Sequence, residues 1–71
     1  MRWTPQDLDR LERAIDEGAR IQLSRRGTEY VIQPRELRSA GATEEIVAVH
    51  PTTGEEMRFA LDEIDRFSVV G

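Results

Sequence analysis

The chain has 71 residues, a formal net charge of −4 and no cysteine. We expect a single domain over residues 1–71, and the lack of cysteine excludes disulfide bonds and thiolate metal sites as sources of its stability. Because 34% of the residues are charged and no apolar run approaches the roughly 18 residues of a membrane span, we expect a folded, cytoplasmic protein with no membrane partner.

The first predicted element is a helix over residues 5–17. Thr4 is the type of residue that caps a helix start, and Pro5 suits the first helical position. Gly18 suits the left-handed conformation that ends many helices. Trp3 precedes the cap, at the spacing that lets it pack on the fourth helical residue. One narrow apolar stripe follows the helical repeat and is expected to be buried against a sheet: Leu8, Leu11 and Ile15.

β-Strands are predicted after the helix, because the apolar repeat changes from 3.6 residues to two. The clearest pair is a hairpin in which apolar residues 46–49 and 57–59 flank the turn residues 51–54. The first of these strands is apolar throughout, as in a central strand with neighbours on both sides.

Proline and polar residues define the other predicted strand ends. Pro34 cannot donate a ladder hydrogen bond, so we expect it to end the second strand and to begin a loop over residues 34–43. Residues 61–64 are expected to form a single tight turn. Short antiparallel connections, as in a meander, join the five predicted strands, which cover residues 20–24, 29–33, 44–50, 55–60 and 66–70.

Three short motifs occur in order along the chain. They are the run Ala14–Ile21 before the first strand, the sequence Pro-Arg-Glu-Leu at residues 34–37, and the run Phe59–Ile64 after the fourth strand. Over roughly residues 11–70 the chain therefore resembles a WYL domain. The resemblance implies an Sm-like barrel, in agreement with the apolar periodicity. The expected fold is α+β, mostly β, with an N-terminal α-helix capping a five-stranded antiparallel Sm-like β-barrel.

The same resemblance implies a function. The family usually lies behind a DNA-binding domain in bacterial transcriptional regulators, where it is thought to sense nucleic-acid or nucleotide ligands. This chain would be a free-standing and divergent member, because it carries no DNA-binding domain. Moreover, Glu44, Glu45 and Ile46 stand where the family has its Trp-Tyr-Leu tripeptide. Only Arg58 lies near the third motif, where the family tends to place several arginines.

No group of residues predicts catalysis. Nucleophilic catalysis needs a nucleophile, a base and an orienting group, and the only histidine, His50, lies in the predicted turn beside Pro51. The adjacent carboxylates at residues 44–45 and 55–56 point to opposite faces of their strands. Neither a calcium-loop spacing nor a glycine-rich phosphate loop is present. We therefore expect no enzyme activity, no metal site and no cofactor.

Charge is distributed unevenly along the chain. Residues 20–38 contain five arginines and two glutamates, whereas residues 39–71 contain seven carboxylates and two arginines. Clustered arginines attract phosphates. The alternative, which the overall acidity favours, is that these arginines pair with the acidic second half, within one molecule or between subunits. The candidate residues for binding a nucleic acid or another anionic ligand are Arg20, Arg25, Arg26, Arg35, Arg38 and Arg58.

Two functions follow from these patterns. The overall acidity favours a small non-enzymatic interaction module of bacterial type, which self-associates through an edge strand as a homo-oligomer or acts with a regulatory partner protein. The alternative is an RNA- or nucleotide-binding module that uses the arginines of residues 20–38. Four phosphate contacts would give a log–log salt slope of about −3 on single-stranded RNA. At physiological salt we expect the acidic remainder of the surface to keep such binding weak.

Overall fold

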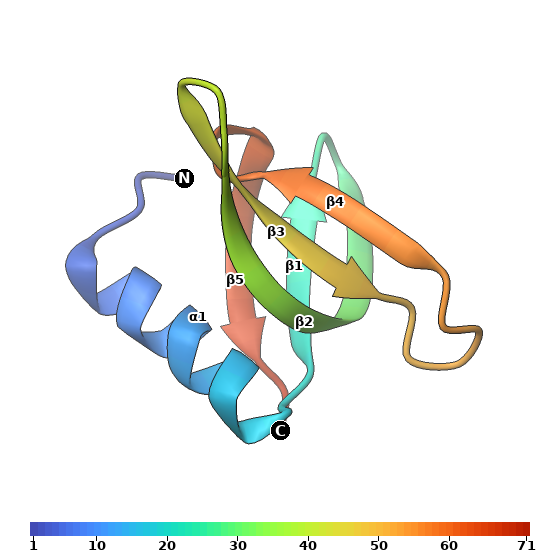
Figure 1. The fold of residues 1–71 in the computed structure, drawn as a ribbon. Coiled ribbons are helices and arrows are strands. Elements are labelled where there is room, and N and C mark those ends of the chain that lie inside the picture. The colour runs from blue at the N-terminus through green and yellow to red at the C-terminus, as the bar shows by residue number, and fades with distance from the viewer.

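The computed structural model describes all residues, 1–71, as one helix followed by five strands (Figure 1). The helix, α1, spans Pro5–Glu17, and a short 3₁₀ turn, η1, spans Leu61–Glu63. Neither has the length and apolar character needed to cross a membrane. The strands are β1 (Ile21–Arg25), β2 (Thr28–Ala40), β3 (Thr43–Val49), β4 (Glu56–Ala60) and β5 (Ile64–Val69). All pairs are antiparallel, in the order β4-β3-β2-β1-β5, which confirms the predicted helix-plus-sheet class.

The helix begins and ends at the predicted residues. Thr4 Oγ1 accepts a hydrogen bond from the Asp7 N–H, and the Asp7 carboxylate accepts one from the Thr4 N–H, so the two residues form a capping box. Gly18 ends the helix at a φ of 68°, in the left-handed conformation. Leu11 is fully buried at the centre of the predicted apolar stripe, which confirms that the stripe faces the core.

Trp3 ties the start of the helix to the far end of the chain. Its ring stacks on Phe67 of β5, with the ring centroids 5.0 Å apart. Its Nε1–H donates to the Leu61 carbonyl at 2.9 Å. On the same phenyl ring lies the guanidinium of Arg10 from α1, 4.9 Å from the centroid. These contacts join α1, η1 and β5, which are distant in sequence.

The core lies between α1 and the inner face of the sheet. Phe59 of β4 is fully buried, which confirms the predicted inward face of this strand. The Tyr30 ring meets the Phe59 ring edge-on, with centroids 5.1 Å apart. β3 lies between β2 and β4 as the predicted central strand. Every element except η1 supplies at least one of the largest fully buried side chains: Leu11, Ile21, Leu23, Ile32, Pro34, Ile46, Phe59 and Ile64.

The longest strand, β2, continues through Pro34 to Ala40. The predicted strand end at Pro34 and the predicted loop over residues 34–43 are therefore wrong, because most of that segment pairs with β3. Figure 1 shows β2 curving along its length. Its first half pairs with β1 and its second half with β3, so β2 joins the two halves of the sheet.

A β-bulge explains how this strand accommodates a proline. The partners of Pro34 and Glu36 are consecutive residues of β3, which leaves Arg35 as an extra residue without a partner. Proline is tolerated at bulges because the ladder is already interrupted there. The extra residue also shifts the in–out alternation by one position. Pro34 before the bulge and Leu37 after it therefore both face the core.

The sheet is not closed into the predicted barrel, because β4 and β5 remain its two edges. β5 returns to pair with β1, so the strand order also differs from a simple meander. A side chain links β1 to the edge strand β4: Arg25 Nη1 donates to the Arg58 carbonyl at 3.4 Å. The Arg25 guanidinium also lies 4.6 Å from the centroid of the Phe59 ring. β1 and β4 are therefore joined by a cation–π contact and one side-chain hydrogen bond, and not by a ladder of backbone hydrogen bonds.

We expect Phe59→Ala to lower the free energy of unfolding by about 3–5 kcal/mol, because it removes a fully buried ring. A core of this size contributes only about that much, so the variant should be largely unfolded. Val31→Ala is the control, because Val31 is 43% exposed, and it should cost at most about 1 kcal/mol. Thermal melts followed by circular dichroism measure both. A Phe59→Ala variant that melts near the wild-type temperature would contradict the described core.

The capping box makes the helix start sensitive to acid. The pKa of the Asp7 carboxyl is lowered from its ordinary value of 3.8, first by the hydrogen bond from the Thr4 N–H, then by the Thr4 hydroxyl and by Arg10. A carboxyl with a depressed folded-state pKa contributes stability above its unfolded pKa. That contribution is lost as the pH falls through the folded pKa.

We therefore expect the melting temperature to fall between about pH 5 and pH 2, and to fall less steeply in Asp7→Asn. Asp9→Asn removes an exposed carboxyl from the same turn and serves as the control. Equal slopes for wild type and Asp7→Asn would show that the capping box does not contribute to acid sensitivity.

Candidate functional site

The six candidate arginines do not form one cluster. Two lie at the end of β1, two on the outer face of β2 and β4, and two beside the start of β1. Their surroundings differ in one respect that matters for binding, which is whether the guanidinium already has a partner within the chain.

Arg25 and Arg26, at the end of β1, are engaged within the chain. The Arg25 guanidinium lies over the Phe59 ring and reaches the edge strand β4. Arg26 forms an ion pair with Glu63 at 3.7 Å, and its N–H donates to the Asp65 carboxylate at 3.1 Å. Both residues hold the β1–β2 turn against the neighbouring elements.

Arg38 and Arg58 belong to a row of ion pairs on the outer face of β2, β3 and β4. Arg38 pairs with Glu36, and Arg58 pairs with Glu45 at 3.4 Å and with Glu56 at 3.3 Å. Exposed pairs of this kind contribute little to stability. They nevertheless cancel the positive charge locally, so this face offers no excess of positive charge to a ligand.

Arg20 and Arg35 line one hollow in the surface, of about 350 Å³. The opposite wall is the turn between β3 and β4, including His50, Thr52 and Thr53. No carboxylate lines this hollow, and neither arginine takes part in an ion pair. We call it the Arg20–Arg35 pocket.

Backbone contacts position both arginines of the pocket. The Arg20 N–H donates to the Gly71 carbonyl at 3.2 Å, and the Arg20 carbonyl accepts from the Val70 N–H at 2.9 Å. Gln33 Nε2 donates to the carbonyl of the residue before Arg20 at 3.2 Å, which joins β2 to this segment. Arg35 is the extra residue of the β2 bulge, and a bulge redirects the side chain it carries.

His50 shapes the turn that forms the other wall. Its Nδ1 accepts hydrogen bonds from the N–H groups of Thr52 at 3.1 Å and Thr53 at 3.3 Å. Its carbonyl accepts from the Gly54 N–H at 2.9 Å. A backbone N–H can only donate, so Nδ1 is the acceptor in both hydrogen bonds. His50 is therefore a turn residue, as predicted, although it is half-buried rather than fully solvated.

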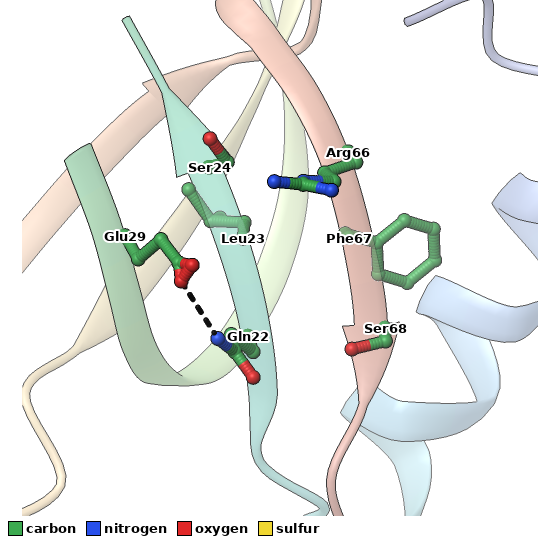
Figure 2. Close-up of a pocket in the computed structure, with 7 residues that line it drawn as sticks. All are labelled: Gln22, Leu23, Ser24, Glu29, Arg66, Phe67 and Ser68. Atoms are coloured by element: carbon green, nitrogen blue, oxygen red, sulfur yellow. Dashed lines mark hydrogen bonds between the residues drawn. The ribbon is translucent and has the colours of Figure 1, made fainter. Parts of the chain in front are cut away.

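A second hollow, of about 290 Å³, lies on the outer face of β5, β1 and β2 (Figure 2). In the strand register Ser24 of β1 stands between Glu29 of β2 and Arg66 of β5. Figure 2 shows Arg66 extending toward β1, whereas the Phe67 ring extends toward α1. The sequence-based reasoning missed Arg66, because its position beside β1 depends on the pairing of the last strand with the first.

No three histidine, aspartate or glutamate side chains lie close enough together to hold a metal ion. Models of known protein families gave no match to the chain, and curated proteins gave no similar sequence. A functional proposal therefore rests on the geometry of the two hollows.

We expect His50→Ala to lower the free energy of unfolding by roughly 1 kcal/mol, because two backbone N–H groups lose their acceptor. His50→Asn should retain most of the stability, because an asparagine side-chain oxygen accepts the same pair of hydrogen bonds in a turn. Thermal melts measure the stability, and amide hydrogen exchange at Thr52 and Thr53 measures the turn. Equal exchange in wild type and His50→Ala would contradict this role for the imidazole.

Proposed function

We propose that the protein is a small non-enzymatic binding module that takes the phosphate of a nucleotide or of single-stranded RNA into the Arg20–Arg35 pocket. One observation carries the proposal: two arginines without ion-pair partners line a hollow that contains no carboxylate. The chain as a whole has a formal net charge of −4, so the charge of this pocket is opposite in sign to that of the whole chain. The planar guanidinium matches the oxygens of a phosphate group.

The rest of the pocket supports recognition of the phosphate rather than of a base. Thr52 and Thr53 add hydroxyl groups to the opposite wall, and Gln33 adds an amide. No phenylalanine, tyrosine or tryptophan lines the pocket, and its one aromatic ring is the imidazole of His50, which is held in the turn by the Thr52 and Thr53 N–H groups. Contacts to phosphate position a nucleic acid but do not read its sequence. Binding is therefore expected to be independent of base identity.

The proposed family and fold detail rest on sequence resemblance and strand order. We regard the chain as a divergent WYL-like domain of a cytoplasmic bacterial regulator, with an open form of the Sm-like barrel. Support comes from the order β4-β3-β2-β1-β5, from the helix before β1, and from the curved β2 shared by both halves of the sheet.

We predict that Arg20→Ala and Arg35→Ala each weaken phosphate binding about tenfold, since each removes one charge-assisted contact. The measurement is an NMR titration with inorganic phosphate, with a nucleoside monophosphate and with a short single-stranded RNA. On RNA the log–log salt slope should be about −1.4 for two contacts, rather than the value near −3 for four.

Arg13→Ala is the matched control, because it removes the same charge from an exposed position of α1. Its affinity for all three ligands should stay within about twofold of wild type. An equal loss in Arg13→Ala would show that binding follows only the overall charge. A response to RNA with none to phosphate or nucleotide would assign the pocket to polymeric ligands.

A further inference from the structure

α1 and the core lie on the inner side of β5, β1 and β2, and the side chains on the outer side of these strands are exposed apart from Ser24. The strand register places six side chains there, in two parallel rows of three. One row runs Arg66, Ser24, Glu29 and the other runs Ser68, Gln22, Val31. We call these six residues the β1 face.

Opposite charges stand at the two ends of the first row. Arg66 is on β5 and Glu29 is on β2, with the buried Ser24 of β1 between them. Neither charged group takes part in an ion pair. Glu29 accepts a hydrogen bond from Gln22 Nε2 at 3.2 Å, which holds its carboxylate on this face (Figure 2). The middle residue of this row, Ser24, has a small side chain, so no large side chain projects between Arg66 and Glu29.

This arrangement is complementary to itself. A two-fold axis parallel to β1, lying between two copies stacked face to face, places Arg66 of each copy opposite Glu29 of the other. The same axis places Ser24 opposite Ser24, and the exposed Val31 opposite Ser68. An interface with two-fold symmetry has this reciprocal pattern, in which residue i meets j and j meets i.

We propose that the β1 face is a self-association surface, and that its occupant is the β1 face of a second copy of the chain. Charge complementarity carries the proposal, because two ion pairs form at once and the small Ser24 at the centre of the charged row allows the two copies to approach there. The edge strands are less suited to pairing. β4 and β5 are short and carry charged residues, and β5 is bulged at Asp65, all features that discourage edge-to-edge association.

The size of the face indicates a weak association. Three strands spaced about 4.8 Å apart and roughly 20 Å long cover on the order of 300 Å² per copy. A stable interface buries about 800 Å² per partner. We therefore expect dimers only toward millimolar protein concentration. Dilution should move the NMR signals of β1, β2 and β5 on this face, and sedimentation should show an increase in mean mass with concentration.

Charge reversal tests the geometry. Arg66→Glu and Glu29→Arg should each remain monomeric, because each places like charges opposite one another across the axis. An explanation by net charge predicts otherwise for Glu29→Arg, which brings the net charge of the chain closer to zero and would strengthen association. The double variant Glu29→Arg/Arg66→Glu should regain the wild-type association, since both pairs are restored with their signs exchanged.

A mixture of the two single variants is the sharpest experiment. Each is expected to be monomeric alone, whereas an equimolar mixture should form a heterodimer in which both pairs are again opposite in sign. Isotope labelling of one variant follows this directly by NMR. Arg13→Glu on α1 is the control, and this variant should associate as strongly as the wild-type protein. Thermal melts exclude unfolding as the cause of any loss.

Two results would overturn the proposal. The first is a wild-type protein whose mean mass shows no increase up to about 2 mM, within the millimolar range where we expect dimers to form. The second is a Glu29→Arg variant that associates as strongly as wild type, which would mean that the two charges do not face each other between copies. Neither result depends on the Arg20–Arg35 pocket, so both can be obtained whether or not that pocket binds phosphate.

Discussion

The single extra residue in β2 is the constraint on which most of the structure depends. The sheet needs one strand that pairs with β1 along its first half and with β3 along its second. A regular strand of that length would carry the same alternation throughout, and the apolar residues of β2 do not. Ile32 and Pro34 are spaced by two, but Leu37 is spaced by three from Pro34. One unpaired residue between them lets all three side chains face the core.

The same bulge connects the packing of the core to the candidate site. Its unpaired residue is Arg35, whose side chain lines the pocket together with Arg20. A second bulge, at Asp65 of β5, is used in the same way, because the Asp65 carboxylate accepts the N–H of Arg26 in the β1–β2 turn. In both cases the bulge leaves a charged residue without a ladder partner, so its side chain does not have to follow the in–out alternation of the strand. Bulges beside functional sites commonly have this double role.

The features that could be predicted from the sequence are those that depend on interactions between residues close together in the chain. Thr4, Pro5 and Gly18 determine the helix bounds through contacts within a few residues, and those bounds were predicted correctly. The hairpin of β3 and β4 is equally local.

The missed features are non-local. Neither the continuation of β2 past Pro34 nor the return of β5 to β1 follows from neighbouring residues. The first needs the partner strand β3 to reveal the bulge, and the second needs the ladder between β1 and β5, which are distant in sequence. The candidate site was missed in part for the same reason. Six arginines were equivalent in the sequence, and only their neighbours across the sheet distinguish Arg20 and Arg35 from those that are paired.

The two proposed surfaces have a geometric relation that bears on the kind of ligand. The Arg20–Arg35 pocket lies at the start of β1, and the proposed two-fold axis runs parallel to β1. Rotation about that axis leaves the direction along β1 unchanged, so both pockets of a dimer would lie at the same end. A free nucleotide gains nothing from this, because it occupies one pocket at a time. A single-stranded RNA long enough to reach both would bind as a bivalent ligand, at an effective concentration set by the spacing of the pockets. Weak association and weak phosphate binding would then reinforce each other on a polymer alone.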